Sequence, residues 1–500
     1  MSDPDFDVII MGAGLSGIGA AHHLQTRSPG RTYAILESRD DLGGTWDLFR
    51  YPGIRSDSDM YTFGYNFRPW TGGKVFADGP SIRQYVRDTA EDGDIHRHIR
   101  FGHTVSAANW DSETARWIVR ATRADGSRVE LSCRFFILCS GYYRYDQGYL
   151  PDFPGMADFT GEIIHPQLWP EGHDYSGKKV VIIGSGATAI TLVPAMAEQA
   201  EHVTMLQRSP TYIAARPSRD AIADWLRKLL PARTAYALSR AKNIALAIYV
   251  YQLSRRFPAF VKKQVIKLVK EQMGEGFDVE KHFTPSYNPW DQRFCLAPDG
   301  DFFDVLKSGD ASIMTEQIDR FVPGGIRLAS GETIEADLII PAIGLDMQIA
   351  GGAHISLDGR LLRPGELYTY RGMMLGGVPN LALAFGYTNA SWTLKVDLTF
   401  ERICRMLNHM KKTGTQVAIA ELPDDIEPAP LLDFSSGYIQ RALPNLPRQG
   451  SKAPWRTYQN YLQDMMTIRF GSLEDGHMRF APAGEPVALA RPDPAREAAE

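Results

Sequence analysis

The pattern of apolar positions predicts the same local structure at two places in the chain. Residues 7–11 (DVIIM) and 179–183 (KVVII) are short, nearly continuous apolar runs, typical of strands buried on both faces of a parallel sheet. Each run is followed by a glycine-rich turn and then by a segment with the apolar spacing of a helix. The chain therefore contains two predicted strand–turn–helix units, as in α/β folds.

The first turn has the G-x-G-x-x-G spacing, formed by Gly12, Gly14 and Gly17. The first glycine permits the tight turn, the second lets a pyrophosphate approach the backbone, and the third allows close packing of helix on strand. Free N–H groups at the helix N-terminus favour an anion, and Ser16 offers one more hydrogen bond. The next predicted strand ends in Glu37, where a carboxylate binds a ribose diol. This unit predicts an FAD site.

The second turn repeats the spacing, but its neighbouring strand ends differently. The residues expected to contact NADP in this turn are Gly184, Ser185, Gly186, Ala187, Thr188 and Ala189. Gln207 stands where the first unit has its carboxylate, and Arg208 and Ser209 follow it. A carboxylate would repel the 2′-phosphate of NADP, whereas a guanidinium beside a hydroxyl binds it through charge-assisted hydrogen bonds. This unit therefore predicts NADPH as its ligand.

Two further apolar runs, 135–141 and 336–344, end in small residues, as strands do where a chain crosses between two dinucleotide-binding domains. We therefore predict an α/β fold with two Rossmann-like domains, for FAD and NADP. The FAD-binding domain is discontinuous, residues 1–150 and 346–500, and the NADP-binding domain spans 151–345. The polar final ten or so residues are expected to be disordered.

Composition excludes several classes of protein. The 500 residues are 44% hydrophobic and 23% charged, and the net charge of −5 gives no reason to expect nucleic acid as a partner. The four cysteines form no C-x-x-C pair and no Cys/His cluster, so neither a disulfide-reductase relay nor a metal site is predicted. No signal segment or membrane-length apolar run is present, and we expect a cytoplasmic protein.

A connector between the two units carries a family resemblance. Residues 159–170 (FTGEIIHPQLWP) match the pattern F-x-G-x-x-x-H-x-x-x-W-P through Phe159, Gly161, His165, Trp169 and Pro170. This pattern resembles the signature of the Baeyer–Villiger monooxygenases, a family of class B flavoprotein monooxygenases. The segments that resemble one branch, which includes mycobacterial thioamide-activating enzymes, are 42–61, 282–295 and 377–395.

The resemblance implies an NADPH- and O2-dependent enzyme that converts ketones to esters or lactones through a C4a-peroxyflavin and also oxidises sulfides or thioamides. Two alternatives remain: an S- or N-oxygenating monooxygenase without ketone activity, and a nucleotide-binding redox sensor without turnover. Trp169 argues against the first, and Arg293 with Asp57 argues against the second.

Glycine-rich and turn residues near the first unit are expected at the site. Gly44 lets the backbone pass close to a ligand, and Thr45 and Trp46 are placed to cover the flavin. A Pro-Gly turn then brings three polar residues to one place: Arg55, Ser56 and Asp57, all expected at NADP.

Individual roles follow from the resemblance. It implies that Asp57 lies at both the flavin and the nicotinamide and pairs with an arginine, and that Val105 makes a backbone contact with the FAD adenine. It implies that Arg293 stabilises the negative flavin peroxide and the tetrahedral intermediate. His165 is expected to couple the domains during the cycle and to take no part in the chemistry.

The strand pattern stops at residue 216, and a helical insert is predicted over about 216–310. Residues 221–272 contain eleven Lys or Arg against two acids. A basic amphipathic segment can lie on a membrane surface, whereas the family's insert walls the substrate tunnel. Both interpretations stay open, the second being favoured.

Overall fold

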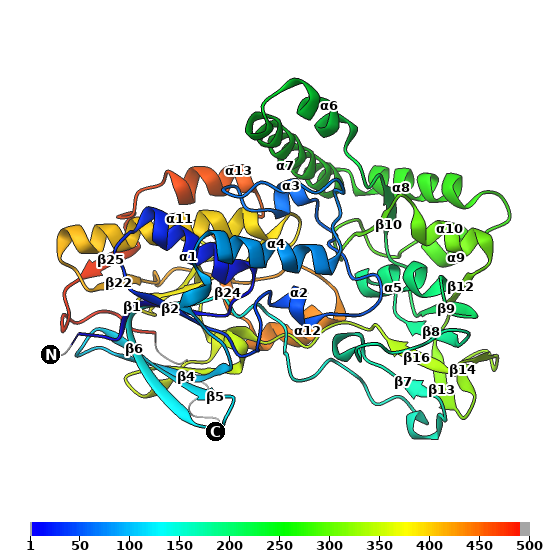
Figure 1. The fold of residues 1–500 in the computed structure, drawn as a ribbon, viewed down its shortest axis with the longest axis horizontal. Coiled ribbons are helices and arrows are strands. Elements are labelled where there is room, and N and C mark those ends of the chain that lie inside the picture. Colours follow the sequence, from blue (N-terminus) through cyan, green and yellow to red (C-terminus); the bar gives the residue numbers. More distant parts are fainter. Residues whose placement is uncertain (1–2, 491–500) are drawn as a thin grey trace.

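The fold is described by a computed structural model that covers residues 3–490 (Figure 1). The predicted disorder of the final ten residues lies outside this range. Two sheets lie toward opposite ends of the molecule in this view: a mixed sheet around β1, β2 and β6, and a parallel sheet around β8, β9 and β16. The predicted α/β fold with two Rossmann-like units is confirmed.

The first sheet has the order β18-β17-β4-β5-β6-β1-β2-β3, and β21 also pairs with β6. Its strands are β1 (Phe6–Met11), β2 (Tyr33–Leu36), β3 (Ile99–Arg100), β4 (His103–Asp111), β5 (Arg116–Arg123), β6 (Arg128–Leu138), β17 (His354–Leu357), β18 (Arg360–Leu361), β19 (Thr369–Tyr370), β20 (Met374–Leu375) and β21 (Leu381–Leu383). Strand β1 pairs in parallel with β2 and β6. The parallel carboxyl ends of these three strands therefore meet at one edge.

The second sheet has the order β12-β9-β8-β16-β7, with every pair parallel. Its strands are β7 (Glu162–Ile163), β8 (Lys179–Ile183), β9 (His202–Gln207), β12 (Ala311–Thr315) and β16 (Leu338–Pro341). The first sheet takes strands both from before residue 162, where the second sheet begins, and from after residue 341, where it ends. That interleaving agrees with a discontinuous first domain, while the boundaries 1–150, 151–345 and 346–500 stay a prediction.

Both central strands bury side chains on two faces, which explains their continuous apolar runs. In β1, Ile10 faces a core shared with helix α1, whereas Ile9 packs with Trp117 on the opposite face. In β8, Ile182 faces the core shared with helix α5, whereas Val181 faces the small sheet of β13–β15. The alternation follows from the strand's period of two residues.

Helices cover both sheets, and smaller sheets complete the fold. The main helices are α1 (Leu15–Arg27), α4 (Gly79–Asp92), α5 (Ala187–Ala197), α10 (Asp301–Ser308) and α11 (Trp392–Thr413), and the short ones are α2 (Thr45–Leu48), α3 (Met60–Phe63), α12 (Gly437–Ala442) and α13 (Tyr461–Asp464). Single turns of tighter or wider helix occur at His96–His98, Met156–Asp158, Pro166–Leu168, Ile349–Gly352, Pro364–Glu366, Leu443–Asn445 and Met465–Arg469. The smaller sheets pair β13 (Ile318–Val322), β14 (Gly325–Leu328) and β15 (Thr333–Glu335); β22 (Val417–Ala420) and β25 (Met478–Ala481); and β23 (Pro428–Pro430) and β24 (Arg448–Gly450).

The helical insert leaves the second unit after β10 (Ile213–Arg216) and returns through β11 (Cys295–Pro298), which pairs with β10 in parallel. Its helices are α6 (Ala221–Leu229), α7 (Ala232–Arg256), α8 (Pro258–Met273) and α9 (Val279–Phe283). Helices α6 and α7 project from the top of the molecule in Figure 1. Within residues 3–490, no helix combines the length and apolarity needed to cross a membrane.

Candidate functional site

A cavity of about 1300 Å³ lies where the carboxyl ends of both sheets meet. It exceeds the roughly 300–1,000 Å³ typical of single-ligand pockets, which suits a site for two dinucleotides and a substrate. The predicted residues that line it are Gly12, Gly14, Ser16, Glu37, Gly44, Thr45, Trp46, Arg55, Ser56, Asp57, Val105, Gly184, Ser185, Gly186, Ala187, Thr188, Arg208, Ser209 and Arg293. Those that lie outside its lining are Gly17, Ala189, Phe159, Gly161, His165 and Trp169.

The first glycine turn is built so that only glycine fits. Gly12 has φ +102°, and a Cβ there would lie 2.7 Å from the carbonyl oxygen of Cys139. A Cβ on Gly17 would lie 1.9 Å from the carbonyl oxygen of Gly12, so this residue serves helix packing behind the cavity wall. Gly14 packs against Gly44 in the cavity wall, where a Cβ on Gly14 would lie 3.4 Å from the Cα of Gly44. This bare backbone at the start of α1 fits a pyrophosphate.

Glu37 is held rigidly at the end of β2. Only 4% of the residue is exposed, and its carboxylate accepts hydrogen bonds from the backbone N–H groups of Ala13 (2.7 Å) and Arg39 (3.0 Å). Burial raises the pKa of Glu37, and the two backbone donors oppose that rise. A fixed carboxylate on the cavity wall next to the pyrophosphate cradle fits the ribose diol of FAD.

The second cradle, at the turn that begins with Gly184, differs from the first because an arginine and not a carboxylate lies beside it. A Cβ on Gly184 would lie 2.2 Å from the carbonyl oxygen of Ala342, so this turn also requires glycine. Arg208 is exposed beside the cavity and has no acidic partner within 4.0 Å among residues 3–490. Gln207 does not line the cavity, and its Nε2 donates to the carbonyl oxygen of His282 and to Thr315 Oγ1, both at 2.8 Å. An unpaired guanidinium next to the cradle fits a 2′-phosphate.

Asp57 and Arg293 meet at the cavity, although they are far apart in the sequence. The Arg293 Nη2 and Asp57 Oδ2 atoms are 2.8 Å apart. The side chains are 42% and 30% exposed, respectively, and both line the cavity. The Asp57 carboxylate raises the pKa of Arg293 further above its ordinary value. Asp57 therefore holds the permanently charged guanidinium of Arg293 at a defined place in the site.

Tyrosines surround this charge, and sequence patterns did not identify them. Tyr142, Tyr143 and Tyr438 line the cavity, and the Tyr142 and Tyr143 hydroxyl oxygens are 3.2 Å apart. Burial raises the pKa of Tyr438 to about 12 and that of Tyr143 well above its ordinary value. The hydroxyls of Tyr143 and Tyr438 therefore stay neutral and can donate hydrogen bonds. The position of Tyr142 directly after the small-residue end of β6 was a signal that could have found it.

Some predicted contacts are already satisfied within the chain. Arg55, expected at NADP, forms an ion pair with Asp301 at the cavity wall. The Ser16 hydroxyl accepts a hydrogen bond from Trp392 Nε1 at 2.8 Å, which brings the indole into the cavity lining. Trp46 stands edge-on to Phe63 with ring centroids 5.7 Å apart. These contacts fix the walls around the first cradle.

The connector motif lies beside the second sheet, away from the cavity lining. Phe159 is buried in the core beneath β13–β15, and a Cβ on Gly161 would lie 2.5 Å from the carbonyl oxygen of Asp337. His165 packs against Gly148, and burial lowers its pKa. Trp169 stands edge-on to Tyr175 at 6.2 Å. The motif ties the edge of the second sheet to the segment 142–149, which lines the site.

Residues 3–490 contain no group of three or more His, Cys, Asp or Glu side chains arranged to hold a metal ion. The charged side chains that line the cavity include Arg208 and Arg293.

Comparison with known proteins gives consistent matches. The model of the flavin-binding monooxygenase-like family matches residues 73–273, and that of the NAD(P)-binding Rossmann-like domain matches 10–87. The chain is 52% identical to the FAD-containing monooxygenase EthA of Mycobacterium tuberculosis, over 97% of this chain and 99% of the relative. It is 50% identical to the probable FAD-binding monooxygenase AlmA of Acinetobacter baylyi, over 95% and 96%.

Solved structures share the fold. A steroid monooxygenase bound to NADP aligns with a TM-score of 0.73 at 23% identity, over 95% of this chain and 99% of that one. A cyclohexanone monooxygenase with bound ε-caprolactone aligns with a TM-score of 0.74 at 20% identity, over the same shares.

Proposed function

The chain belongs to the flavin-binding monooxygenase-like family, and we propose that this FAD- and NADPH-dependent monooxygenase is of the Baeyer–Villiger type. It would convert a ketone, O2, NADPH and a proton into an ester or lactone, NADP+ and water. The observation that carries the proposal is the Asp57–Arg293 ion pair (2.8 Å) in the cavity between the two cradles. When bound, the reduced flavin supplies the oxygen-activating redox chemistry.

The protein's own residues hold the two cofactors in position and stabilise the charge that develops in the reaction. We assign FAD to the cradle of Gly12, Gly14 and Glu37, and NADP to the cradle of Gly184 and Arg208. The Arg293 guanidinium stabilises negative charge that develops on the reacting oxygen atoms, because its own charge is permanent and its position fixed.

The supporting groups around the guanidinium complete the site. Asp57 orients Arg293 through the ion pair. The hydroxyls of Tyr142 and Tyr438 offer further donors, and the aromatic walls limit access of water.

The test of this proposal is Arg293→Ala, compared with Arg255→Ala. Arg255 is a matched control, since it is 40% exposed and pairs with Asp291 at 2.9 Å but does not line the cavity. Arg293→Ala is expected to keep bound FAD and its reduction by NADPH while ester formation falls about 100-fold or more, as when one stabilising donor is removed from a developing oxyanion. Ester formation at the wild-type rate in Arg293→Ala would overturn the role of this residue.

A second candidate is oxygenation at sulfur without ketone activity, which the 52% identity to a monooxygenase of the EthA type keeps open. One product analysis with a linear ketone, a cyclic ketone and an aryl sulfide separates the two candidates. Sulfoxide without any ester would select the second. Ester from either ketone would select the first.

For its place in the cell, we propose a cytoplasmic enzyme whose basic helical insert makes peripheral contact with a membrane.

A further inference from the structure

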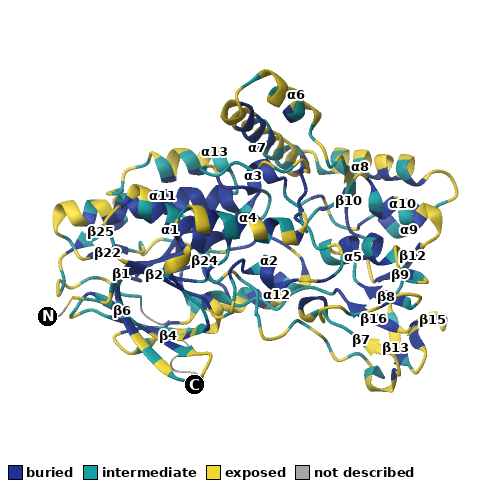
Figure 2. Ribbon diagram, viewed as in Figure 1, coloured by how far each residue is buried: buried dark blue, intermediate teal, exposed yellow. Residues whose placement is uncertain are grey.

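The helical insert differs from the rest of the surface in its exposed apolar side chains. Ten of the eighteen large apolar side chains exposed in residues 3–490 lie within 221–272: Ile222, Trp225, Leu229, Leu238, Leu246, Tyr249, Val250, Phe257, Phe260 and Leu268. Three of them, Ile222, Trp225 and Leu229, are 54–60% exposed and share one face of α6 at spacings of three and four residues. Helix α6 thus turns its apolar stripe toward solvent, at the outer end of the insert (Figures 1 and 2).

The charge of the insert is opposite to that of the remaining chain. Residues 221–272 carry eleven basic and two acidic residues, a net charge of +9. The whole chain carries −5, so the remainder carries −14. Around α6, Lys228 and Arg233 are exposed and have no acidic partner within 4.0 Å among the described residues. An anionic surface would attract the insert and repel the body, which orients the molecule with α6 toward that surface.

We propose that Ile222, Trp225, Leu229 and Leu238, with Lys228 and Arg233, form a docking surface for the anionic headgroup region of a lipid bilayer. We call it the tip surface. A solvent-facing apolar stripe flanked by basic side chains is the pattern of helices that lie in the plane of a membrane interface. A second copy of the chain fits less well, because a symmetric contact would bring two +9 inserts together. The inference makes the proposed peripheral contact specific and is independent of the oxygenation chemistry.

Vesicle sedimentation tests the tip surface. The wild-type protein is expected to sediment with phosphatidylglycerol/phosphatidylcholine vesicles at low salt, and far less with phosphatidylcholine alone or at 0.5 M salt. Trp225→Ser/Leu229→Ser is expected to weaken binding about tenfold or more, as is Lys228→Glu/Arg233→Glu. The matched control is Met466→Ser/Phe470→Ser, which removes apolar side chains of similar exposure (61% and 65%) outside the insert.

Two results would overturn the tip surface. One is a wild-type protein that stays in the supernatant with anionic vesicles at low salt. The other is equal binding by the tip and control variants. Sedimentation equilibrium without lipid adds a check. If the protein does not bind vesicles and forms an oligomer that Trp225→Ser/Leu229→Ser dissociates, the tip surface is an interface between copies of the chain. Turnover with ketone or sulfide reports separately on the proposed function.

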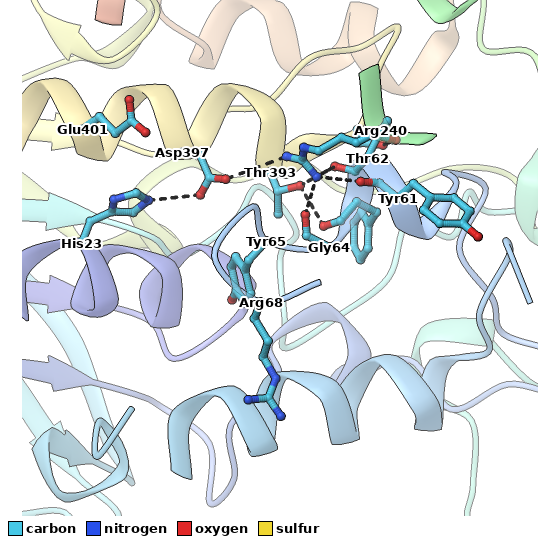
Figure 3. Close-up of polar contacts among 12 residues, drawn as sticks. His23, Tyr61, Thr62, Gly64, Tyr65, Arg68, Arg240, Thr393, Asp397 and Glu401 are labelled. Carbon is cyan, nitrogen blue, oxygen red and sulfur yellow. Dashed lines mark hydrogen bonds and ion pairs between the residues drawn. The ribbon is translucent and has the colours of Figure 1, made fainter. Parts of the chain in front are cut away.

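A different observation concerns the inner face of α7, which grips the short helix α3 (Figure 3). Arg240 Nη1 donates to the carbonyl oxygens of Tyr61 (2.7 Å) and Gly64 (2.8 Å), at the C-terminal end of α3. Asn243 Nδ2 donates to Asp59 Oδ1 (2.9 Å), the side chain that caps the N-terminal end of α3. Helix α7 therefore holds both ends of α3.

The arginine in this contact is deeply buried and electrostatically supported. Arg240 is 6% exposed, and its Nη2 lies 3.9 Å from Asp397 Oδ2. Asp397 also faces His23, with 3.2 Å between Oδ1 and Nε2. Figure 3 shows the chain of contacts from His23 through Asp397 to Arg240 and the backbone of α3. Removing a charge from such a network costs more than removing one at the surface.

The segment before α3 carries the active-site carboxylate. Asp57 lies two residues before Asp59, in a turn closed by Ser56 and Ser58. The Ser56 hydroxyl donates to the carbonyl oxygen of Ser58 (2.8 Å) and accepts from the Ser58 N–H (3.0 Å). A shift of α3 would therefore reach Asp57 through this stiff turn. We infer that Arg240 and Asn243 are positioning residues for the Asp57–Arg293 pair, a role that rests on the proposed function of that pair.

The readout for this inference is the ratio of oxygenated product to NADPH consumed, in variants that retain FAD. Asn243→Ala is expected to lower the ratio about fivefold or more. Arg240→Lys, which keeps the charge but not the forked donor, is expected to fall between wild type and Arg240→Ala. Lys242→Ala is the matched control, since Lys242 lies on the same helix but pairs with Asp220.

The outcomes separate the positioning role of Arg240 and Asn243 from the role of the Asp57–Arg293 pair. A wild-type ratio in FAD-loaded Asn243→Ala, alongside a low ratio in Arg293→Ala, would overturn the positioning role alone. A wild-type ratio in Arg293→Ala would overturn the function of the pair itself. If the product ratio of the Arg240 variants falls only in proportion to bound FAD or to a lower melting temperature, Arg240 serves folding and not positioning.

Discussion

Arg208→Ala tests which cofactor the second cradle selects. Arg208 follows β9, lies beside the cavity and has no acidic partner among the described residues, so its charge is free for a ligand. A charge-assisted hydrogen bond contributes about 1.5–3 kcal/mol, and the exposure of Arg208 places its contribution near the lower end. At about 1.4 kcal/mol per factor of ten, the loss should be about 10- to 30-fold.

The assay compares kcat/KM for NADPH and for NADH in wild type and variant. Arg208→Ala should lose this factor with NADPH and change little with NADH, because NADH lacks the 2′-phosphate. NADH thus serves as an internal control for damage to the fold. Arg208→Glu should reverse the preference, since a carboxylate repels the phosphate. An unchanged NADPH preference in Arg208→Ala, or an equal loss with both cofactors, would refute the reasoning.

Two further predictions concern the first unit. Gly17→Ala should abolish or strongly weaken FAD binding and lower the free energy of unfolding by about 1–3 kcal/mol or more, because the added Cβ would lie 1.9 Å from the Gly12 carbonyl oxygen. Gly73→Ala is the control, since a Cβ there would have no atom within 4 Å. Flavin absorbance and a melting curve measure the two effects. The His22 ring is stacked on Phe67 with ring centroids 3.5 Å apart, and burial lowers the pKa of His22 to about 4. Between about pH 6.5 and 4 the unfolded chain therefore takes up a proton that the folded protein does not. Stability should therefore fall by at most about 3 kcal/mol as the pH drops through this window, and His22→Gln should flatten the fall in melting temperature; parallel curves would contradict this.

Much of the site was predictable because its recognition elements are local. A glycine whose neighbour is one turn away in sequence, as Gly17 and Gly12 are, has its steric environment set by the strand–turn–helix unit itself. The difference between Glu37 and Arg208 at two equivalent strand ends was likewise visible from spacing alone. Predictions based on short-range geometry therefore identified the fold class and the two glycine turns that line the cavity, while the family followed from the resemblance of the connector motif.

Tertiary structure decided the contacts between distant segments. Only the fold brings Asp57 from the first unit against Arg293 at the end of the insert, places Tyr438 beside them, and engages Arg55 with Asp301. The sequence shows Arg240 as one more basic residue of an amphipathic helix, whereas the structure buries it against the backbone of α3. The amino-acid sequence by itself determined the form of the two turns and predicted a ligand for each, since turn chemistry depends on neighbours in the chain. Where the Arg293 charge lies, and what holds it there, depends on packing between residues hundreds of positions apart, which no local pattern encodes.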